Sequence, residues 1–410
     1  MNLPENVSVP AAAVPHAGGR TWRGAAGAWL GIGTAPGALV LGAQVGGRHG
    51  GALPAVLLLV GGLVMAALLA VQGRFGLLPP AGENAAMAEL APRYLPATAE
   101  RVFTGLLALA MVGWFGFNVG LGGAALAALG GVPDPVGVAV LAVPTVGVLL
   151  AGGGRWNAVA VVTTLTAVAL VAVVAVRLPP PGSPVTFARD GPFGGLAADL
   201  AGYIGYVSVF AVRAPDFTVG LRRRADLAWC VALLVGPALA ASVVGAGVAA
   251  ASGSTDVVAV LAGPDGLPAA NLFMAAAVIA PTLAAVHSGV FAVRRFATGL
   301  PWRAAVLAIA VPGAVLAALR VDRMLFDWLT VLAAALPALI PPMAAEAARR
   351  RRGRPPKPVP TWLWAPGAAL ASAFTVAGYP QAAPAGLAVS VLATAVHALT
   401  VTRRFRRVIE

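Results

Sequence analysis

Apolar runs of about 20 residues recur along the chain, and short polar or glycine- and proline-rich segments separate them. A run of this length crosses a hydrocarbon layer of about 30 Å as one helix. Twelve such runs are present, and they predict helices at approximately 24–43, 52–72, 102–129, 136–152, 157–177, 195–213, 227–250, 271–292, 303–319, 326–345, 362–379 and 383–401. The pattern predicts an all-α polytopic membrane protein with about 12 transmembrane helices.

The composition excludes a soluble enzyme, because 59% of the residues are hydrophobic and only 10% are charged. Soluble domains carry roughly a quarter charged residues. The net charge of +13 does not indicate a nucleic-acid partner, since the basic residues cluster between the apolar runs. The single cysteine, Cys230, lies in a predicted span, and we expect it to be a small core residue.

The distribution of Lys and Arg predicts the orientation. With the N-terminus inside, 23 of the 28 basic residues fall on the cytoplasmic side and 5 on the other. Cytoplasmic loops carry such an excess, so both termini are expected in the cytoplasm of a cell-membrane protein. No signal peptide is expected, since the first residues lack a basic region followed by an apolar stretch.

The chain divides into four predicted parts. Residues 1–20 are expected to form a flexible cytoplasmic tail, 21–348 a ten-helix core, 349–360 a basic cytoplasmic loop, and 361–410 two additional helices with a basic C-terminus. The basic loop contains "RRRRGRPPKP". It is interpreted as a stop-transfer charge cluster, and binding of anionic lipid is the alternative.

Two predicted helices are interrupted by residues that weaken helices. The first contains Pro36 among several glycines, and the sixth has a second weak point at Gly202, Tyr203, Gly205, Tyr206 and Ser208. Five helices separate the two interruptions, which indicates two inverted halves of a transporter. The alternative is that glycines only allow close helix packing.

Polar chemistry inside the spans is sparse. The helix cores lack Asp and Glu, which argues against a proton pump built on buried carboxylates. His287 either relays protons or hydrogen-bonds a neighbouring helix. Arg213 and Asp216, three residues apart, are expected to pair or to face a loop, with a gate as the alternative. No catalytic motif and no phosphate-binding loop is visible, so the protein is not expected to be an enzyme or to hold a cofactor.

Three stretches resemble one known family. "VGWFGFNVGLGGAAL" looks like the "GWFG" signature of the cytosine permease branch of the nucleobase:cation symporter-1 family. "APDFTVGLRRRADL" and "LFDWLTVLAAALPALIPPMAAEAARRRR" resemble two further segments of that family, in the same order and spacing. The resemblance implies a five-plus-five inverted repeat (LeuT-like) with two extra C-terminal helices. It also implies sodium- or proton-driven uptake of a flat nucleobase-like compound.

The resemblance assigns roles to residues by position. Trp114 matches the indole that stacks on the substrate, and an aromatic platform with glycines beside it suits a planar heterocycle. Phe115 is expected to pack into a neighbouring helix. The whole expected substrate set is Trp114, Met111, Asn118, Tyr206, Val207, Phe210 and Leu283. The implied cation ligands are backbone carbonyls from Gly31 to Thr34, the carbonyl near Val278 and the Thr282 hydroxyl.

This chain departs from the family at four positions. Met111 stands where cytosine members carry an amide, and Val207 stands where an aromatic ring is expected, with Tyr206 and Phe210 beside it. Pro281 replaces one of two adjacent sodium-binding hydroxyls, and Leu283 occupies a recognition position. A cation site that loses an oxygen ligand binds more weakly, and so does a base-reading site that loses a polar partner.

The sequence therefore predicts a secondary active transporter that imports a nucleobase-like heterocycle of the cytosine or purine type by alternating access, with Na⁺ or H⁺ as coupling ion. Two alternatives stay open: a non-transporting membrane receptor or scaffold on the same fold, and a permease for a less polar heterocycle. The expected partners are the small heterocycle and the lipid bilayer. The sequence does not indicate an oligomeric state.

Overall fold

The computed structural model describes residues 19–48, 53–151, 156–177, 196–263, 267–297, 299–324, 327–328, 331–332, 336–377, 379 and 382–409. Of the predicted tail, residues 1–18 lie outside the described part. Arg20 is held in place, since its amide donates to the Gly220 carbonyl oxygen and its Nε donates to the Val219 carbonyl oxygen.

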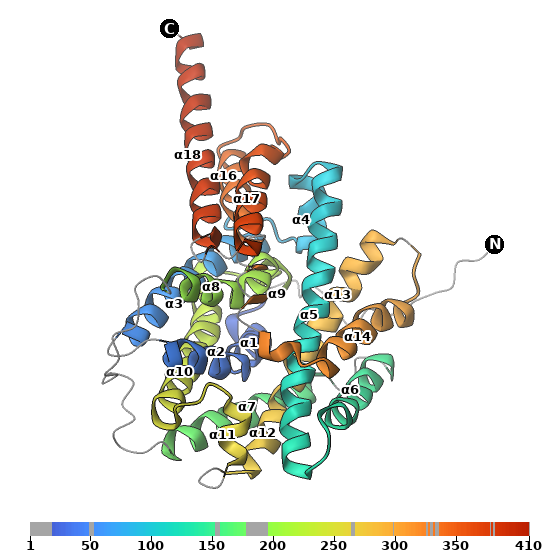
Figure 1. The fold of residues 1–410 in the computed structure, drawn as a ribbon. Helices are drawn as coiled ribbons and strands as arrows, with labels where there is room; N and C mark the ends of the chain where they lie inside the picture. Colours follow the sequence, from blue (N-terminus) through green and yellow to red (C-terminus); the bar gives the residue numbers. More distant parts are fainter. Residues whose placement is uncertain are drawn as a thin grey trace, which may run out of the picture.

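The described chain is helical almost throughout (Figure 1). The α-helices are α1 Trp22–Gly33, α2 Gly37–Arg48, α3 Leu53–Gly73, α4 Met87–Tyr94, α5 Ala97–Gly130, α6 Asp134–Ala151, α7 Trp156–Arg177, α8 Leu196–Val212, α9 Ala214–Thr218, α10 Arg224–Ser252, α11 Val257–Ala262, α12 Ala269–Ala277, α13 Ile279–Phe296, α14 Trp302–Ala318, α16 Ile340–Arg351, α17 Ala365–Val376 and α18 Ala382–Ile409. Short 3₁₀ turns are η1 Arg74–Gly76, η4 Val321–Met324, η5 Pro337–Leu339 and η6 Thr361–Leu363.

The helices have the length and composition of membrane spans. In the described part, five helices are long and apolar enough to cross a bilayer, and the bent pair α1–α2 makes a sixth. Four further apolar helices are shorter. The structure confirms the all-α, multi-span class. α18 has 28 residues, or about 42 Å of helix, so it extends beyond its predicted span of 383–401.

The helices pack in two groups that repeat the same pattern. The first and second spans (α1–α2 and α3) contact the sixth and seventh (α8 and α10). The third and fourth spans (α5 and α6) contact the eighth and ninth (α12–α13 and α14). Helices one and two thus pair with six and seven, and three and four with eight and nine, as the five-plus-five repeat predicts.

The break predicted in the first span is present. α1 ends at Gly33, α2 begins at Gly37, and the two axes differ in direction by 41°. Pro36 has no amide hydrogen to donate to the preceding turn, which explains the position of the break. The glycines that follow Pro36 also allow close helix packing, because a Cβ on Gly42 would overlap the Ser242 carbonyl of α10. Both interpretations hold for this helix.

The break predicted at Gly202–Ser208 in the sixth span is wrong in position. α8 is continuous from Leu196 to Val212, and the interruption falls at Arg213, before α9. A glycine weakens a helix by only about 1 kcal/mol, whereas Pro215 removes a backbone hydrogen bond outright. The Gln72 Nε2 of α3 donates to the Val212 carbonyl at 3.3 Å, which satisfies an acceptor at this break.

A third interruption was not expected from the sequence. The eighth span divides at Val278 into α12 and α13. Pro281 lies three residues later and has no amide hydrogen to donate to the Ala277 carbonyl. The three interruptions described here therefore lie in the first, sixth and eighth spans.

The basic segments gather at one end of the molecule. α4, α16 and the C-terminal end of α18 lie at the top in Figure 1, and α11 lies at the opposite end. The first part of the predicted basic loop is helical, since α16 continues to Arg351. Arg349 and Arg350 form ion pairs with Glu346 there, at 2.6 and 2.8 Å. The grouping agrees with the expected cytoplasmic side, whose assignment remains a prediction.

Candidate functional site

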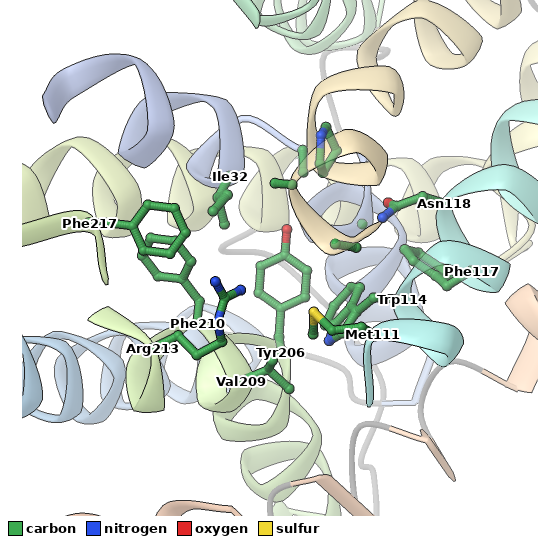
Figure 2. A pocket seen from close by; sticks show the side chains of 15 residues that line it. Ile32, Met111, Trp114, Phe117, Asn118, Tyr206, Val209, Phe210, Arg213 and Phe217 are labelled. Atoms are coloured by element: carbon green, nitrogen blue, oxygen red, sulfur yellow. The ribbon is translucent and has the colours of Figure 1, made fainter. Parts of the chain in front are cut away.

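A pocket of about 580 Å³ lies where the interrupted helices meet (Figure 2). It is bounded by the α1–α2 break, α5, the α8–α9 break and α13, so both packing groups contribute walls. The lining residues are Ile32, Ala35, Gly37, Met111, Trp114, Phe117, Asn118, Tyr206, Val209, Phe210, Arg213, Phe217, Pro281, Ala284 and Ala285.

Aromatic rings form most of the wall. The Trp114 indole meets Phe117 edge-on, with ring centroids 5.7 Å apart, and it meets Tyr206 in the same way at 5.6 Å. On the other side, Phe210 stacks on Phe217 at 4.6 Å. Trp114 is only partly buried and faces the cavity. An indole in this position can hold the face of a flat ring.

The neighbouring Phe115 has a different environment. Its side chain is fully buried and packs against Gly313 of α14. The prediction that Phe115 packs into a neighbouring helix is confirmed. The two adjacent rings in the "GWFG" stretch therefore have different roles. Trp114 faces the pocket, and Phe115 packs α5 against α14.

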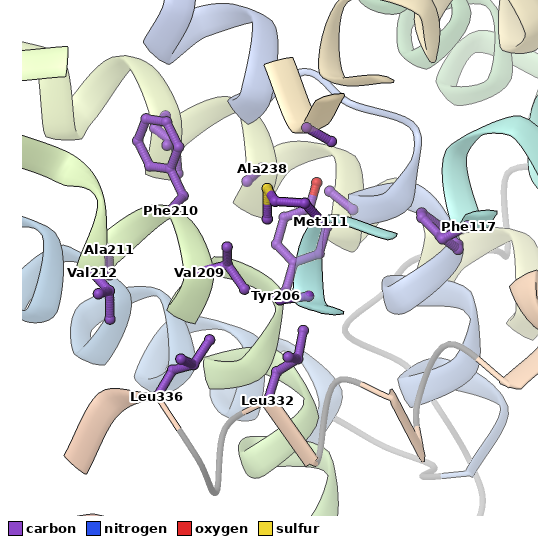
Figure 3. Close-up of a cluster of buried hydrophobic side chains, with 14 of the residues drawn as sticks. Met111, Phe117, Tyr206, Val209, Phe210, Ala211, Val212, Ala238, Leu332 and Leu336 are labelled. Atoms are coloured by element: carbon purple, nitrogen blue, oxygen red, sulfur yellow. The ribbon is translucent and has the colours of Figure 1, made fainter. Parts of the chain in front are cut away.

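The core below the pocket is apolar. Figure 3 shows Tyr206 and Val209 of α8 above Leu332 and Leu336 of the tenth span. Of the predicted tenth span, 326–345, the structure describes residues 327–328, 331–332 and the chain from Leu336 onward, which begins with η5. The Ser390 hydroxyl of α18 donates to the Ala338 carbonyl at 2.5 Å, so the twelfth helix holds this irregular turn.

Three polar side chains reach the cavity. Asn118 is 2% exposed, and its amide has no hydrogen bond to any of the described residues. The Tyr206 hydroxyl lies near the backbone of Ala38 at the start of α2. Arg213 pairs with Asp216 at 3.0 Å and lies over the Phe217 ring at 5.5 Å from its centroid. The pocket thus combines ring surfaces with an amide, a hydroxyl and a guanidinium.

Five of the seven expected substrate residues line this pocket: Met111, Trp114, Asn118, Tyr206 and Phe210. Val207 lies on α8, and its side chain is outside the described part. Leu283 is buried and does not line the cavity.

The helical period explains the position of Leu283. At about 100° per residue, Pro281, Ala284 and Ala285 share the face of α13 that meets the pocket, and Leu283 points to the opposite side. The recognition position implied by the resemblance therefore falls on a residue outside the lining.

The expected cation ligands sit on two helix breaks. The Thr282 hydroxyl donates to the Val278 carbonyl at 2.6 Å, and the Thr34 hydroxyl donates to the Leu30 carbonyl at 2.9 Å. Each hydroxyl oxygen keeps lone pairs for a further contact. α1 and α13 touch each other, and Gly31 is buried in α1. In the described residues no three His, Cys, Asp or Glu side chains cluster as a metal site would require.

The charged or titratable residues Arg213, Asp216 and His287 lie in different surroundings. The predicted Arg213–Asp216 pair is present, and Arg213 also lines the pocket, which the sequence analysis did not anticipate. His287 is absent from the lining and contacts the rings of Phe291 and Trp302, with centroids at 4.9 and 5.7 Å.

No family model matches the chain, and no curated protein sequence matches it. The solved structures do match. The inward-facing form of Mhp1 superposes with a TM-score of 0.74 and 16% identity, covering 94% of this chain and 93% of Mhp1.

Two further structures agree. Mhp1, described as a nucleobase-cation-symport-1 family transporter, in a closed conformation with bromovinylhydantoin bound, gives a TM-score of 0.72 and 17% identity over 97% of this chain and 96% of Mhp1. A Na⁺-coupled sialic acid symporter gives 0.61 and 12% identity, covering 93% and 91%. At these identities the likeness concerns the fold: this chain has the fold of Mhp1 and related symporters.

Proposed function

We propose that the protein is a secondary active transporter of the nucleobase:cation symporter-1 type, which imports a planar nucleobase-like heterocycle by alternating access. The observation that carries the proposal is the pocket described above, which joins two helix breaks from one packing group to two helices of the other. A site between two groups of helices is the arrangement that alternating access requires.

The chemistry of the walls suits a flat heterocycle. Such a ligand has two apolar faces and a polar rim. The Trp114 and Tyr206 rings supply surfaces for the faces, and the Asn118 amide supplies both a donor and an acceptor for the rim. The hydantoin bound to Mhp1 is a ligand of this shape class. These features support a heterocyclic substrate.

Cytosine itself fits less well than the family resemblance implies. Met111 replaces an amide, and the α13 wall consists of Pro281, Ala284 and Ala285, which carry no polar side-chain groups. A thioether accepts hydrogen bonds only weakly. We therefore assign the substrate to the wider class of planar heterocycles rather than to the cytosine permease branch.

For the coupling ion we propose sodium, held by the carbonyls of Gly31 and Thr34, the Val278 carbonyl and the Thr282 hydroxyl. Neutral oxygens of this kind are suitable ligands for a hard cation. Both helix breaks that supply them also contribute walls of the pocket, so an ion there would order the substrate site. The proton alternative relies on His287, which contacts the rings of Phe291 and Trp302 and does not line the pocket.

Uptake measurements test the proposal. The full-length protein is reconstituted in proteoliposomes with an imposed sodium gradient, and entry of radiolabelled uracil and hydantoin is followed. Gradient-dependent accumulation is expected. Binding of these compounds without accumulation would favour the receptor or scaffold alternative, and absence of binding across a wide panel of planar heterocycles would contradict the proposal.

A further inference from the structure

One fixed charge borders a pocket that is otherwise formed by rings, aliphatic groups and neutral polar groups. Arg213 is the only lining residue that carries a charge at neutral pH, and its side chain is 9% exposed. It sits at the interruption between α8 and α9. A buried guanidinium in apolar surroundings is expensive unless its N–H groups are used.

The pairing of Arg213 leaves donors unused. Its Nε and Nη2 both reach the same oxygen, Oδ2 of Asp216, at 3.1 and 3.0 Å. The other carboxylate oxygen, Oδ1, accepts from the Met87 amide at 2.6 Å. A guanidinium has five N–H donors, and two are engaged. Among the described residues, Nη1 of Arg213 has no hydrogen-bond partner.

The unused donors are directed at the substrate space. Tyr206, Phe210 and Arg213 follow the spacing i, i+4, i+7, which puts them along one face of the sixth span. Side chains on a helix lean toward its N-terminus, so the long Arg213 side chain reaches back toward Tyr206. Figure 2 shows the guanidinium between the Phe210–Phe217 pair and the Tyr206 ring.

We propose that the substrate is a planar heterocycle that carries a carboxylate, and that Arg213 binds this carboxylate. This inference rests on the transporter function proposed above and narrows its substrate class. Guanidinium and carboxylate form parallel, charge-assisted hydrogen bonds, and a partly desolvated pocket strengthens them. A neutral heterocycle can offer a carbonyl oxygen to the remaining N–H groups but no opposite charge, and the lining itself contains no carboxylate.

The test compares two ligands that share one ring. Uracil and uracil-6-carboxylate are titrated into the purified full-length protein by calorimetry. The wild type should bind the carboxylate more tightly. Arg213→Gln should weaken carboxylate binding by roughly 10- to 150-fold, the range for hydrogen bonds to charged groups. It should weaken uracil binding much less, because a carbonyl oxygen of uracil carries no charge to pair with Arg213.

A second variant should change the affinity for the carboxylate ligand in the opposite direction. Asp216→Asn removes the charge that competes for Arg213, and its amide oxygen can still accept from the Met87 amide. Carboxylate binding should therefore become tighter while uracil binding stays the same. A purely structural ion pair would not make the two variants move in opposite directions. If Arg213→Gln fails to fold, Arg213→Lys takes its place. Lysine keeps the charge but lacks the planar guanidinium, so its affinity for the carboxylate ligand should be intermediate.

The outcomes separate this inference from the proposed function. Equal wild-type affinity for both ligands, unchanged in Arg213→Gln and Asp216→Asn, would overturn the role of Arg213 and leave a carrier of neutral heterocycles. Trp114→Ala serves as the reference, since it should weaken both ligands alike. A wild type that binds neither ligand and none of the planar heterocycles tested for uptake would overturn both proposals.

Discussion

Replacing the pocket-facing indole offers the sharpest test of how the site binds its ligand. In Trp114→Leu the platform is lost while an apolar side chain of helical propensity remains. Stacking of a base on an aromatic side chain contributes about 1–3 kcal/mol. The dissociation constant for a planar heterocycle should therefore rise roughly 5- to 150-fold. The indole also makes two edge-on ring contacts, each worth about 0.5–1.5 kcal/mol, so a modest loss of stability is expected as well.

The adjacent ring provides a matched control. Phe115 is fully buried against Gly313 and does not line the pocket. Phe115→Leu should lower the melting temperature, because removing buried ring atoms leaves a cavity, and it should leave ligand affinity unchanged. Affinity is measured by calorimetry and stability by thermal unfolding, both on purified protein. Wild-type affinity in Trp114→Leu, or equal loss of affinity in both variants, would refute the platform role.

Three further changes have defined outcomes. Thr282→Ala should raise the sodium concentration needed for half-maximal uptake at constant pH, and uptake that follows pH alone in this variant would exclude the proposed ion. Burial opposes ionisation of Glu346, but hydrogen bonds from its arginine partners outweigh this effect and lower the pKa of Glu346 below the ordinary 4.5. The carboxylate thus stabilises the fold above that pH, so the wild type should melt at a higher temperature than Glu346→Gln from pH 8 to 6, and this difference should shrink below about pH 4.5. A difference in melting temperature that does not depend on pH would contradict the role of this carboxylate. Gly42→Leu should strongly reduce the yield of folded protein by clashing with the Ser242 carbonyl, while Gly27→Leu, where a Cβ meets no atom within 4 Å, should fold normally.

The length of the apolar runs and the position of Pro36 predicted much of the fold. Apolar runs of bilayer length located the spans, because each must satisfy its backbone within one helix. Pro36 located the first break, since it removes a hydrogen bond that the helix cannot replace. Pro215 and Pro281 lie beside the other two interruptions, but a proline alone does not locate a break, since Pro144, Pro237 and Pro312 lie inside continuous helices.

The site was partly predictable for a related reason. Trp114, Phe117 and Asn118 of α5 lie within a stretch that resembles the family, whereas Tyr206 and Phe210 of α8 were expected because they flank Val207, where the family carries an aromatic ring. Arg213 was predicted to pair with Asp216 or to face a loop at the end of the sixth span, with a gate as the alternative, and not to line the pocket. Its spacing of four and seven residues from Phe210 and Tyr206 would have put it on the pocket face. Leu283 was predicted from the resemblance alone, and it lies on the face of α13 that points away from the pocket.

The seam between the first and seventh spans restricts how the pocket opens. Gly42 and Gly46 of α2 face Ser242, Gly245 and Ala246 of α10 with backbone nearly touching backbone. The Ser242 hydroxyl also donates to the Ala38 carbonyl at 3.0 Å. Surfaces this close have no room to slide past one another, so α2 and α10 must travel as one rigid pair. Gly33 at the end of α1 lies equally close to the Leu234 backbone of α10, so both halves of the broken first span are tied to α10, and the movements of the proposed transport cycle must fall outside this three-helix unit.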